Sequence, residues 1–214
     1  MSTTEGRRVR KVQESREAMA AAAVDLVLEK GLDGVTVEAI SDRVDVSRRT
    51  FARYFSGKED AVVDSLRADF ARINAALAAR PADENPLTAY HRALHDWLDG
   101  DPHAWPHRPR AGELLHLLHA EPALRAAYGN VRDEAQHESV RIVAERLGQD
   151  PERDLRPALA IALAVGAFGT AVRFWIAPGA DTTAPGAAAP LPELIDAAFA
   201  ALAAEPAPST TPHK

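Results

Sequence analysis

Residues 36–58, TVEAISDRVDVSRRTFARYFSGK, have the pattern of two short helices joined by a sharp turn. Thr36 can cap the first helix, because its hydroxyl can accept a hydrogen bond from an otherwise unpaired backbone N–H, and apolar residues then recur at spacings of three and four. Asp45 tolerates the left-handed backbone conformation that a tight turn between helices requires. Ser47 can cap the second helix. The stretch therefore predicts a helix-turn-helix.

The second of these helices presents basic and hydroxyl side chains on one exposed face. Phe51 and Phe55 are four residues apart and are expected to face the core. That leaves six side chains toward solvent or a partner: Arg48, Arg49, Thr50, Ala52, Arg53 and Tyr54. Guanidinium groups match guanine O6 and N7, and hydroxyls and cations match phosphates, so this face suits the major groove of DNA. The alternative to DNA binding is that these arginines are ordinary solvated residues on a helix surface.

This segment resembles the DNA-binding domain of the TetR family of bacterial transcription regulators. The resemblance runs through GLDGVTVEAISDRVDVSRRTFARYFSGKEDAV, residues 31–62. The matching positions are the threonine cap at Thr36, the V-S-x-x-T core at Val46, Ser47 and Thr50, the Y-F pair at Tyr54 and Phe55, and the K-E pair at Lys58 and Glu59. Two positions depart from the family pattern: Asp45 stands where glycine is usual, and Ala52 where a large aromatic residue is usual.

We expect DNA contacts from nine residues: Thr36, Ser47, Arg48, Arg49, Thr50, Arg53, Tyr54, Lys58 and, in a basic N-terminal arm, Arg8. Lys58 begins the next helix, where the helix dipole and free N–H groups favour phosphate, so we expect it to position the protein rather than to read sequence. The basic arm can contact DNA phosphates or the minor groove beside the second helix. The alternative is that it is a solvated tail.

The composition favours packed helices and excludes several functions. The 214 residues are 46% hydrophobic but only 6% aromatic, which suggests a core of Ala, Leu and Val. The absence of cysteine excludes disulfides, thiolate metal sites and a cysteine nucleophile. No apolar run reaches the roughly 18 residues of a membrane span, and the N-terminus lacks the apolar core of a signal peptide. We therefore expect a cytoplasmic protein with no membrane partner.

The charge is divided unequally along the chain. Residues 1–58 carry 11 Lys/Arg and 9 Asp/Glu, and the remaining residues carry 14 and 22. The helix-turn-helix end is thus slightly basic and the rest of the chain is acidic. This asymmetry orients an encounter with DNA.

Proline, glycine and helical periodicity predict an all-α fold of two domains. We expect residues 1–57 to form the arm and a three-helix helix-turn-helix DNA-binding domain, residues 58–204 a helical ligand-binding and dimerisation domain, and residues 205–214 a disordered tail. After the first helix, which ends near Lys30, we expect further helices over 58–80, 87–98, 111–120, 122–147, 152–176 and 191–204. The helix over 58–80 joins the two domains.

The TetR resemblance implies a homodimer and a ligand pocket. It implies that the last two long helices pair with their mates as a four-helix bundle, for which we name Ala164, Phe168, Val172, Leu194, Ile195, Ala198 and Phe199. A dimer is also expected from the DNA side, because two half-sites about 34–36 Å apart are read by a two-fold dimer. The operator should therefore be an inverted repeat.

The second half is also similar to a TetR subgroup whose C-terminal domains bind acyl-CoA-like ligands, through HAEPALRAAY and the stretch from AVRFWI to LPELIDAAFAAL. Side chains that can give area to an apolar ligand are the pocket candidates: Tyr90, Trp97, Trp105, Leu118, Tyr128, Phe168 and Trp175. The alternative for each is ordinary core or dimer packing. The effector is expected to be a small molecule, whose identity the sequence does not give.

Metal and enzyme functions have less support. His91 and His95 are four residues apart, and His116 and His119 follow Glu113 at short spacings that can bind a metal from one helix face. No tight cluster of three ligands appears along the sequence, so we assign no metal site and no cofactor. There is no glycine-rich phosphate loop, H-E-x-x-H or G-x-S-x-G motif, so we assign no catalytic residue.

The sequence thus predicts a DNA-binding transcriptional repressor that a small apolar or amphiphilic ligand releases from a palindromic operator. The alternative is a helical sensor of a small molecule or metal, with weak or non-specific DNA binding. The departures at Asp45 and Ala52 keep this alternative open.

Overall fold

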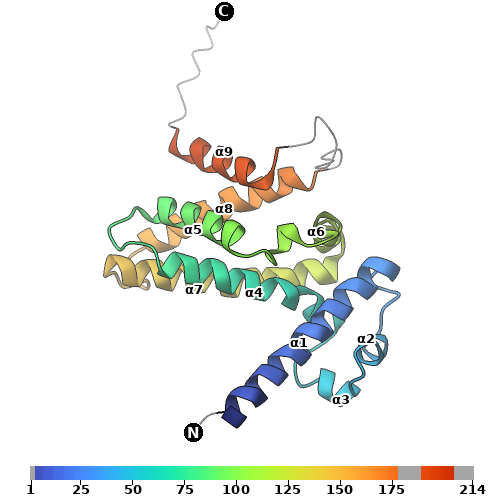
Figure 1. Ribbon diagram of the computed structural model, residues 1–214. Coiled ribbons are helices and arrows are strands. Elements are labelled where there is room, and N and C mark those ends of the chain that lie inside the picture. Colours follow the sequence, from blue (N-terminus) through green and yellow to red (C-terminus); the bar gives the residue numbers. More distant parts are fainter. Residues whose placement is uncertain (1–2, 178–188, 205–214) are drawn as a thin grey trace, which may run out of the picture. The chain divides into compact units, whose positions relative to one another are not determined.

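The computed structural model describes residues 3–177 and 189–204, with side chains from residue 10 onward. Every regular element in these ranges is helical (Figure 1), as predicted. The elements are α1 (Thr3–Lys30), α2 (Val37–Arg43), α3 (Arg48–Phe51), α4 (Lys58–Ala78), α5 (Pro86–Gly100), the 3₁₀ helix η1 (Trp105–His107), α6 (Ala111–Ala120), α7 (Pro122–Leu147), α8 (Arg156–Trp175) and α9 (Leu191–Ala203). The predicted disordered tail, 205–214, lies outside the described residues.

The chain divides into two compact units. The first comprises Met1–Ala75 and Asp101–His137, and the second comprises Ala76–Gly100 and Glu138–Lys214. Helices α4 and α7 contribute residues to both units. This packing does not test the boundary at residue 57 that the sequence predicts between the DNA-binding domain and the ligand-binding domain. That boundary stays a prediction.

In the first unit, α1 packs against α2, and α2 packs against α3 (Figure 1). Apolar side chains from this region are almost fully buried, among them Met19, Leu26, Ile40, Phe51 and Phe55. Gly31 ends α1 with φ +72°, a conformation that favours glycine, and donates its N–H to the Val27 carbonyl at 2.9 Å. Gly34 is also required, because a Cβ there would lie 2.6 Å from the Lys30 carbonyl oxygen.

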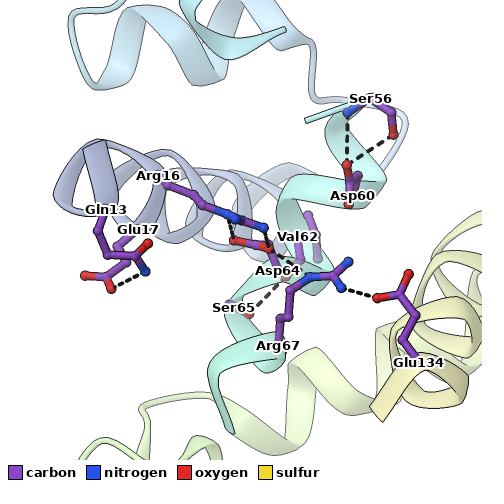
Figure 2. Close-up of polar contacts among 10 residues, drawn as sticks. All are labelled: Gln13, Arg16, Glu17, Ser56, Asp60, Val62, Asp64, Ser65, Arg67 and Glu134. Carbon is purple, nitrogen blue, oxygen red and sulfur yellow. Dashed lines mark hydrogen bonds and ion pairs between the residues drawn. The ribbon is translucent and has the colours of Figure 1, made fainter. Parts of the chain in front are cut away.

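A network of charged side chains connects α1, α4 and α7 within the first unit. Asp64 of α4 is buried and accepts two hydrogen bonds from Arg16 of α1, at 2.9 Å from Nε and 2.5 Å from Nη2. Figure 2 shows Asp64 between Arg16 and Arg67, whose guanidinium reaches Glu134 of α7. The hydrogen bonds to Asp64 outweigh partial burial and raise the pKa of Arg16, so this group stays charged.

The second unit is built on α8 and α9, which pack against each other and against α5. Ile161 and Ala164 of α8 and Ile195 of α9 have no exposed surface. The opposite face of α8 remains exposed at Leu159 and Leu163, with exposed fractions of 54% and 48%. By length and composition α8 could also cross a membrane, but the core helix of a soluble protein meets the same criterion. The packing of α8 against α5 and α9 accounts for its buried apolar face.

Candidate nucleic-acid interface

Both predicted helix caps in the helix-turn-helix are confirmed. Thr36 has extended backbone angles, and its hydroxyl oxygen accepts a hydrogen bond from the Ala39 N–H at 3.1 Å. The Ser47 hydroxyl accepts one from the Thr50 N–H at 3.0 Å and also lies 2.9 Å from the Thr50 hydroxyl. These bonds satisfy backbone donors that the starts of α2 and α3 would otherwise leave unpaired. They fix where α3 begins.

The turn between the two helices uses the left-handed conformation predicted for Asp45. Its φ angle is +51°. The backbone closes around it through a hydrogen bond from the Val46 N–H to the Ser41 carbonyl at 3.0 Å. A non-glycine residue at positive φ is disfavoured, although aspartate tolerates it better than most. Asp45 therefore adopts the left-handed conformation for which glycine is the usual residue.

Helix α3 is shorter than the sequence predicts. Regular α-helix ends at Phe51, and the chain then tightens into turns in which the N–H groups of Arg53 and Tyr54 bond to the carbonyls three residues before them. Such tightening is common at helix ends. Phe51 and Phe55 are nevertheless buried, as predicted, with ring centroids 5.2 Å apart. Their burial holds the opposite side of this segment toward solvent.

Three arginines lie on that exposed side, each in a different setting. Arg48 forms an ion pair with Glu38 of α2 at 2.8 Å, and both side chains are largely exposed. Arg53 lies over the ring of Tyr54, 5.9 Å from its centroid. Arg49 is exposed in the first turn of α3. The structure thus brings together the hydroxyl, guanidinium and phenol groups that the sequence predicted, while their DNA contacts stay predictions.

Lys58 has two partners that the sequence did not predict. Its ammonium group donates hydrogen bonds to the carbonyls of Leu32 at 2.8 Å and Val35 at 3.0 Å. Two of its three N–H donors therefore bind the α1–α2 loop, and its phosphate contact stays a prediction. The sequence could not give this, because the acceptors are backbone carbonyls more than twenty residues earlier. Lys58 fastens the start of α4 to the helix-turn-helix.

The N-terminal arm is also different from the prediction. The backbone is helical from Thr3, so Arg8 belongs to α1 rather than to an extended arm. The side chain of Arg8 lies outside the described part of the structure. Arg10, two residues later, is exposed and lies 3.6 Å from Glu14 one turn along the same helix. The predicted basic arm is therefore the start of α1, and its contact with DNA stays a prediction.

The residues named for a ligand pocket fall in both compact units. Trp105, Leu118 and Tyr128 belong to the first unit, and the other four, Tyr90, Trp97, Phe168 and Trp175, belong to the second. Burial raises the pKa of Tyr128, whose ring stacks with Phe70 at 6.2 Å. In the second unit, Trp97 meets Phe168 edge-on with centroids 6.3 Å apart. Pocket function for these residues stays a prediction.

Five of the seven residues named for the dimer interface are buried inside the chain itself. Their exposed fractions are 0% for Ala164 and Ile195, 7% for Val172 and 8% for Phe168 and Phe199, whereas Leu194 and Ala198 are partly exposed. The five buried residues thus already pack inside the chain, which leaves them little surface for a second subunit. Their part in a dimer interface stays a prediction, because periodicity does not say which partner covers which side of a helix that is apolar nearly all round.

A capped pair of short helices, a left-handed turn and an exposed basic second helix define a helix-turn-helix DNA-binding protein. The comparison with known families agrees with this class. The family model described as bacterial regulatory proteins, tetR family, matches residues 20–62, and that of the MftR C-terminal domain matches residues 84–207. The chain belongs to the TetR family and is a DNA-binding transcriptional regulator.

Individual relatives support the same assignment. The HTH-type transcriptional regulator TcmR of Streptomyces glaucescens is 34% identical over 169 residues, which cover 74% of this chain and 71% of TcmR. The uncharacterized HTH-type transcriptional regulator YdeS of Bacillus subtilis is 43% identical over 52 residues, which cover 24% of this chain and 26% of YdeS.

Solved structures show the same fold at low sequence identity. The fatty acid degradation regulator FadR of Bacillus halodurans matches with a TM-score of 0.52 and 16% identity, covering 94% of this chain and 97% of that one. The multidrug binding protein EbrR complexed with imidazole matches with a TM-score of 0.50 and 21% identity, covering 91% and 97%.

Proposed function

We propose that the protein is a homodimeric repressor that binds an inverted-repeat operator in the cytoplasm and leaves it when a small apolar or amphiphilic effector binds. The exposed basic face of α3, held by the caps at Thr36 and Ser47, is the observation that carries this proposal. Two such faces related by a two-fold axis match two half-sites of opposite direction. The operator sequence therefore has the symmetry of the dimer.

Within α3, we assign base reading to Arg49 and phosphate contact to its neighbours. Arg49 is exposed in the first turn of α3 without an ion pair to another residue of the described part, whereas Arg48 is paired with Glu38 and Arg53 lies over the ring of Tyr54. A guanidinium group can donate two hydrogen bonds to guanine O6 and N7, which discriminates between bases. The hydroxyl groups and the other cationic side chains of this segment are suited to contacts with DNA phosphates.

The exposed face of α8 supports a different dimer surface from the one the sequence suggested. Leu159, Leu163 and Phe174 are 54%, 48% and 66% exposed and recur at helical spacings on the side away from α9's buried contacts. Gly166, between them in the sequence, leaves room for a neighbouring helix to approach. We propose that this face, rather than the buried residues of α8 and α9, binds the second subunit.

Release by an effector follows from linkage. An effector that binds more tightly to the dimer geometry with misaligned recognition helices lowers operator affinity by the ratio of its affinities for the two states. An effector with equal affinity for both states has no effect. Within the second unit, Trp97 and Phe168, whose rings meet edge-on, supply area for an apolar ligand with a polar end.

The operator is identified by selection of random duplex DNA on the full chain, followed by fluorescence anisotropy against a scrambled duplex at fixed salt. We expect a palindromic sequence preferred by about 10³-fold or more. Arg49→Ala should weaken binding to that sequence about 5- to 150-fold, corresponding to about 1–3 kcal/mol, and relax discrimination at one base pair. Arg141→Ala removes the same charge from an exposed arginine of α7 and serves as the control.

A salt-sensitive interaction with no preferred sequence would contradict the repressor proposal and favour the sensor alternative. Equal losses by Arg49→Ala on selected and scrambled DNA would contradict the assignment of base reading.

The dimer surface is tested by sedimentation of the double variant Leu159→Glu, Leu163→Glu. We expect the wild type to sediment at twice the 23.0 kDa chain mass and the variant at the chain mass, because two buried carboxylates cannot be paired at a two-fold contact. Leu147→Glu changes a leucine of α7 that is 36% exposed and should remain dimeric. A dimeric double variant would exclude this face of α8 as the interface.

A further inference from the structure

Two histidines of α5 and one aspartate of α9 meet in the second unit. His91 and His95 are one turn apart on α5, so both imidazoles leave the same helix face. Their Nε2 atoms lie 2.7 Å and 2.8 Å from the same oxygen, Oδ1 of Asp196. Within the described ranges, this is the group of three metal-ligating side chains whose ligand atoms all lie within 4.8 Å of one another.

We propose that His91, His95 and Asp196 bind a divalent transition metal ion, with Zn²⁺ as the best chemical match, and that the ion fastens α9 to α5. This site is independent of the DNA-binding proposal. Imidazole nitrogen and carboxylate oxygen are ordinary zinc ligands, and two histidines with one carboxylate form a common ligand set for catalytic and exchangeable zinc.

The distances are compatible with such an ion. Zinc–ligand bonds of about 2.0–2.2 Å in a tetrahedral site place the ligand atoms about 3.3 Å apart. The two histidine–aspartate distances of 2.7 Å and 2.8 Å are slightly shorter than this value. Small rotations of the three side chains would therefore open the space between them for an ion, without moving either helix.

The surroundings hold the ligands in place while leaving access from solvent. The ring of His91 stacks on Phe199 of α9 with centroids 4.6 Å apart and meets the ring of His95 edge-on at 5.0 Å. The two histidine side chains are 27% and 28% exposed, and that of Asp196 is 58% exposed. An ion entering from solvent could keep water in its remaining coordination position.

Asp196 is suited to an ionised ligand role. Partial burial acts to raise the pKa of its carboxyl group, but the hydrogen bonds from His91 and His95 outweigh that effect and hold the pKa below its usual value. The ordinary pKa of an aspartate carboxyl, about 3.9, already lies well below neutral pH, so the Asp196 carboxylate can compensate half the charge of a divalent ion.

The second histidine pair in the sequence does not form a comparable group. His119 donates from Nδ1 to the Leu115 carbonyl at 2.7 Å, which is a local helix contact. Glu113, the acidic residue nearest this pair in the sequence, is held by Arg110 at 2.7 Å. The pair at His91 and His95 differs because a second helix delivers the third ligand.

Metal binding is tested on the tag-free full-length chain by titration with Zn²⁺ in competition with a chromogenic chelator. We expect one equivalent of zinc per chain. Asp196→Asn and His95→Gln should each weaken it at least about tenfold, since even the loss of a group that only orients a metal ligand costs this much. His137→Gln, which changes an exposed histidine of α7, is the control and should bind as the wild type does.

Two further readouts separate a site from adventitious binding. Zinc should raise the thermal midpoint of the wild type and of His137→Gln, because a ligand that binds only the folded chain stabilises it, and should raise that of Asp196→Asn by much less. Circular dichroism establishes that each variant is folded. Co²⁺ should give a visible d–d absorption band that depends on the same three residues.

Several results would overturn the proposal. Equal zinc affinity in the wild type and Asp196→Asn, or a loss in His137→Gln as large as in the site variants, would assign binding to scattered surface histidines. Absence of zinc binding by the folded wild type would reduce the cluster to a hydrogen-bonded contact between α5 and α9. Each outcome leaves the operator selection as a separate test of DNA binding.

Discussion

Substitution of Asp64 by asparagine tests whether the network of charged side chains in Figure 2, formed by Arg16, Asp64, Arg67 and Glu134, stabilises the first unit. Asparagine has nearly the same shape, but it replaces one acceptor oxygen with an NH₂ group that would face the N–H donors of Arg16. At present Asp64 accepts from Arg16 at 2.9 Å and 2.5 Å and from Arg67 at 3.3 Å. The variant keeps one good acceptor and leaves the other guanidinium donor unpaired.

The magnitude follows from burial. The Asp64 side chain is 9% exposed, whereas those of Arg16 and Arg67 are 35% and 38% exposed. A hydrogen bond to a charged group contributes about 1.5–3 kcal/mol net, and water can replace only part of it at a carboxylate this buried. We expect Asp64→Asn to lower the free energy of unfolding by about 2–3 kcal/mol, which is a decrease of about 4–12 °C in Tm for a chain of this size.

Urea unfolding followed by far-ultraviolet circular dichroism measures this loss, and Glu134→Gln is the matched control. Glu134 is 62% exposed and pairs with Arg67 at the outer end of the same network. Exposed ion pairs contribute about 0–1 kcal/mol, so this variant should be close to the wild type. The reasoning is wrong if Asp64→Asn unfolds with the wild type, or if both variants lose the same amount.

Substitutions at three further positions test the helix-turn-helix. Asp45→Ala should destabilise the chain by about 1 kcal/mol and Asp45→Gly should not, because φ is +51° there; equal thermal midpoints would refute the strain argument. Ser47→Ala removes the cap on α3 and should cost about 0.5–2 kcal/mol, against which Ser209→Ala outside the described residues is the control. Lys58→Met leaves the carbonyls of Leu32 and Val35 without their ammonium partner and should lower Tm as well as DNA affinity. A loss of affinity with unchanged Tm would contradict this structural role and support a direct phosphate contact.

The elements of this fold were predictable because their signals are local. Pro122 separates two helices, which the sequence predicted over 111–120 and 122–147 and which the structure has as Ala111–Ala120 and Pro122–Leu147. The positive φ of Asp45 follows from the turn chemistry of that residue alone. The burial of Phe51 and Phe55 follows from a spacing of four.

What could not be predicted depends on contacts between distant parts of the chain. The acceptors of Lys58 lie on a loop that only the folded first unit brings near. Asp196 follows His91 by more than a hundred residues, so a search for ligands on one helix face could not find it. The two apolar faces of α8 look alike in sequence, and only packing against α5 and α9 shows which of them is covered.

The exposed leucines of α8 also bear on how the regulated genes respond to the supply of the regulator. An operator with two half-sites requires two chains, and the dimer proposed above, held by the exposed face of α8, would dissociate on dilution. Below the dissociation constant of the dimer, its concentration rises with the square of the chain concentration. A twofold change in synthesis of the chain then changes operator occupancy about fourfold. Repression would therefore begin sharply as the protein accumulates, even before any effector is present.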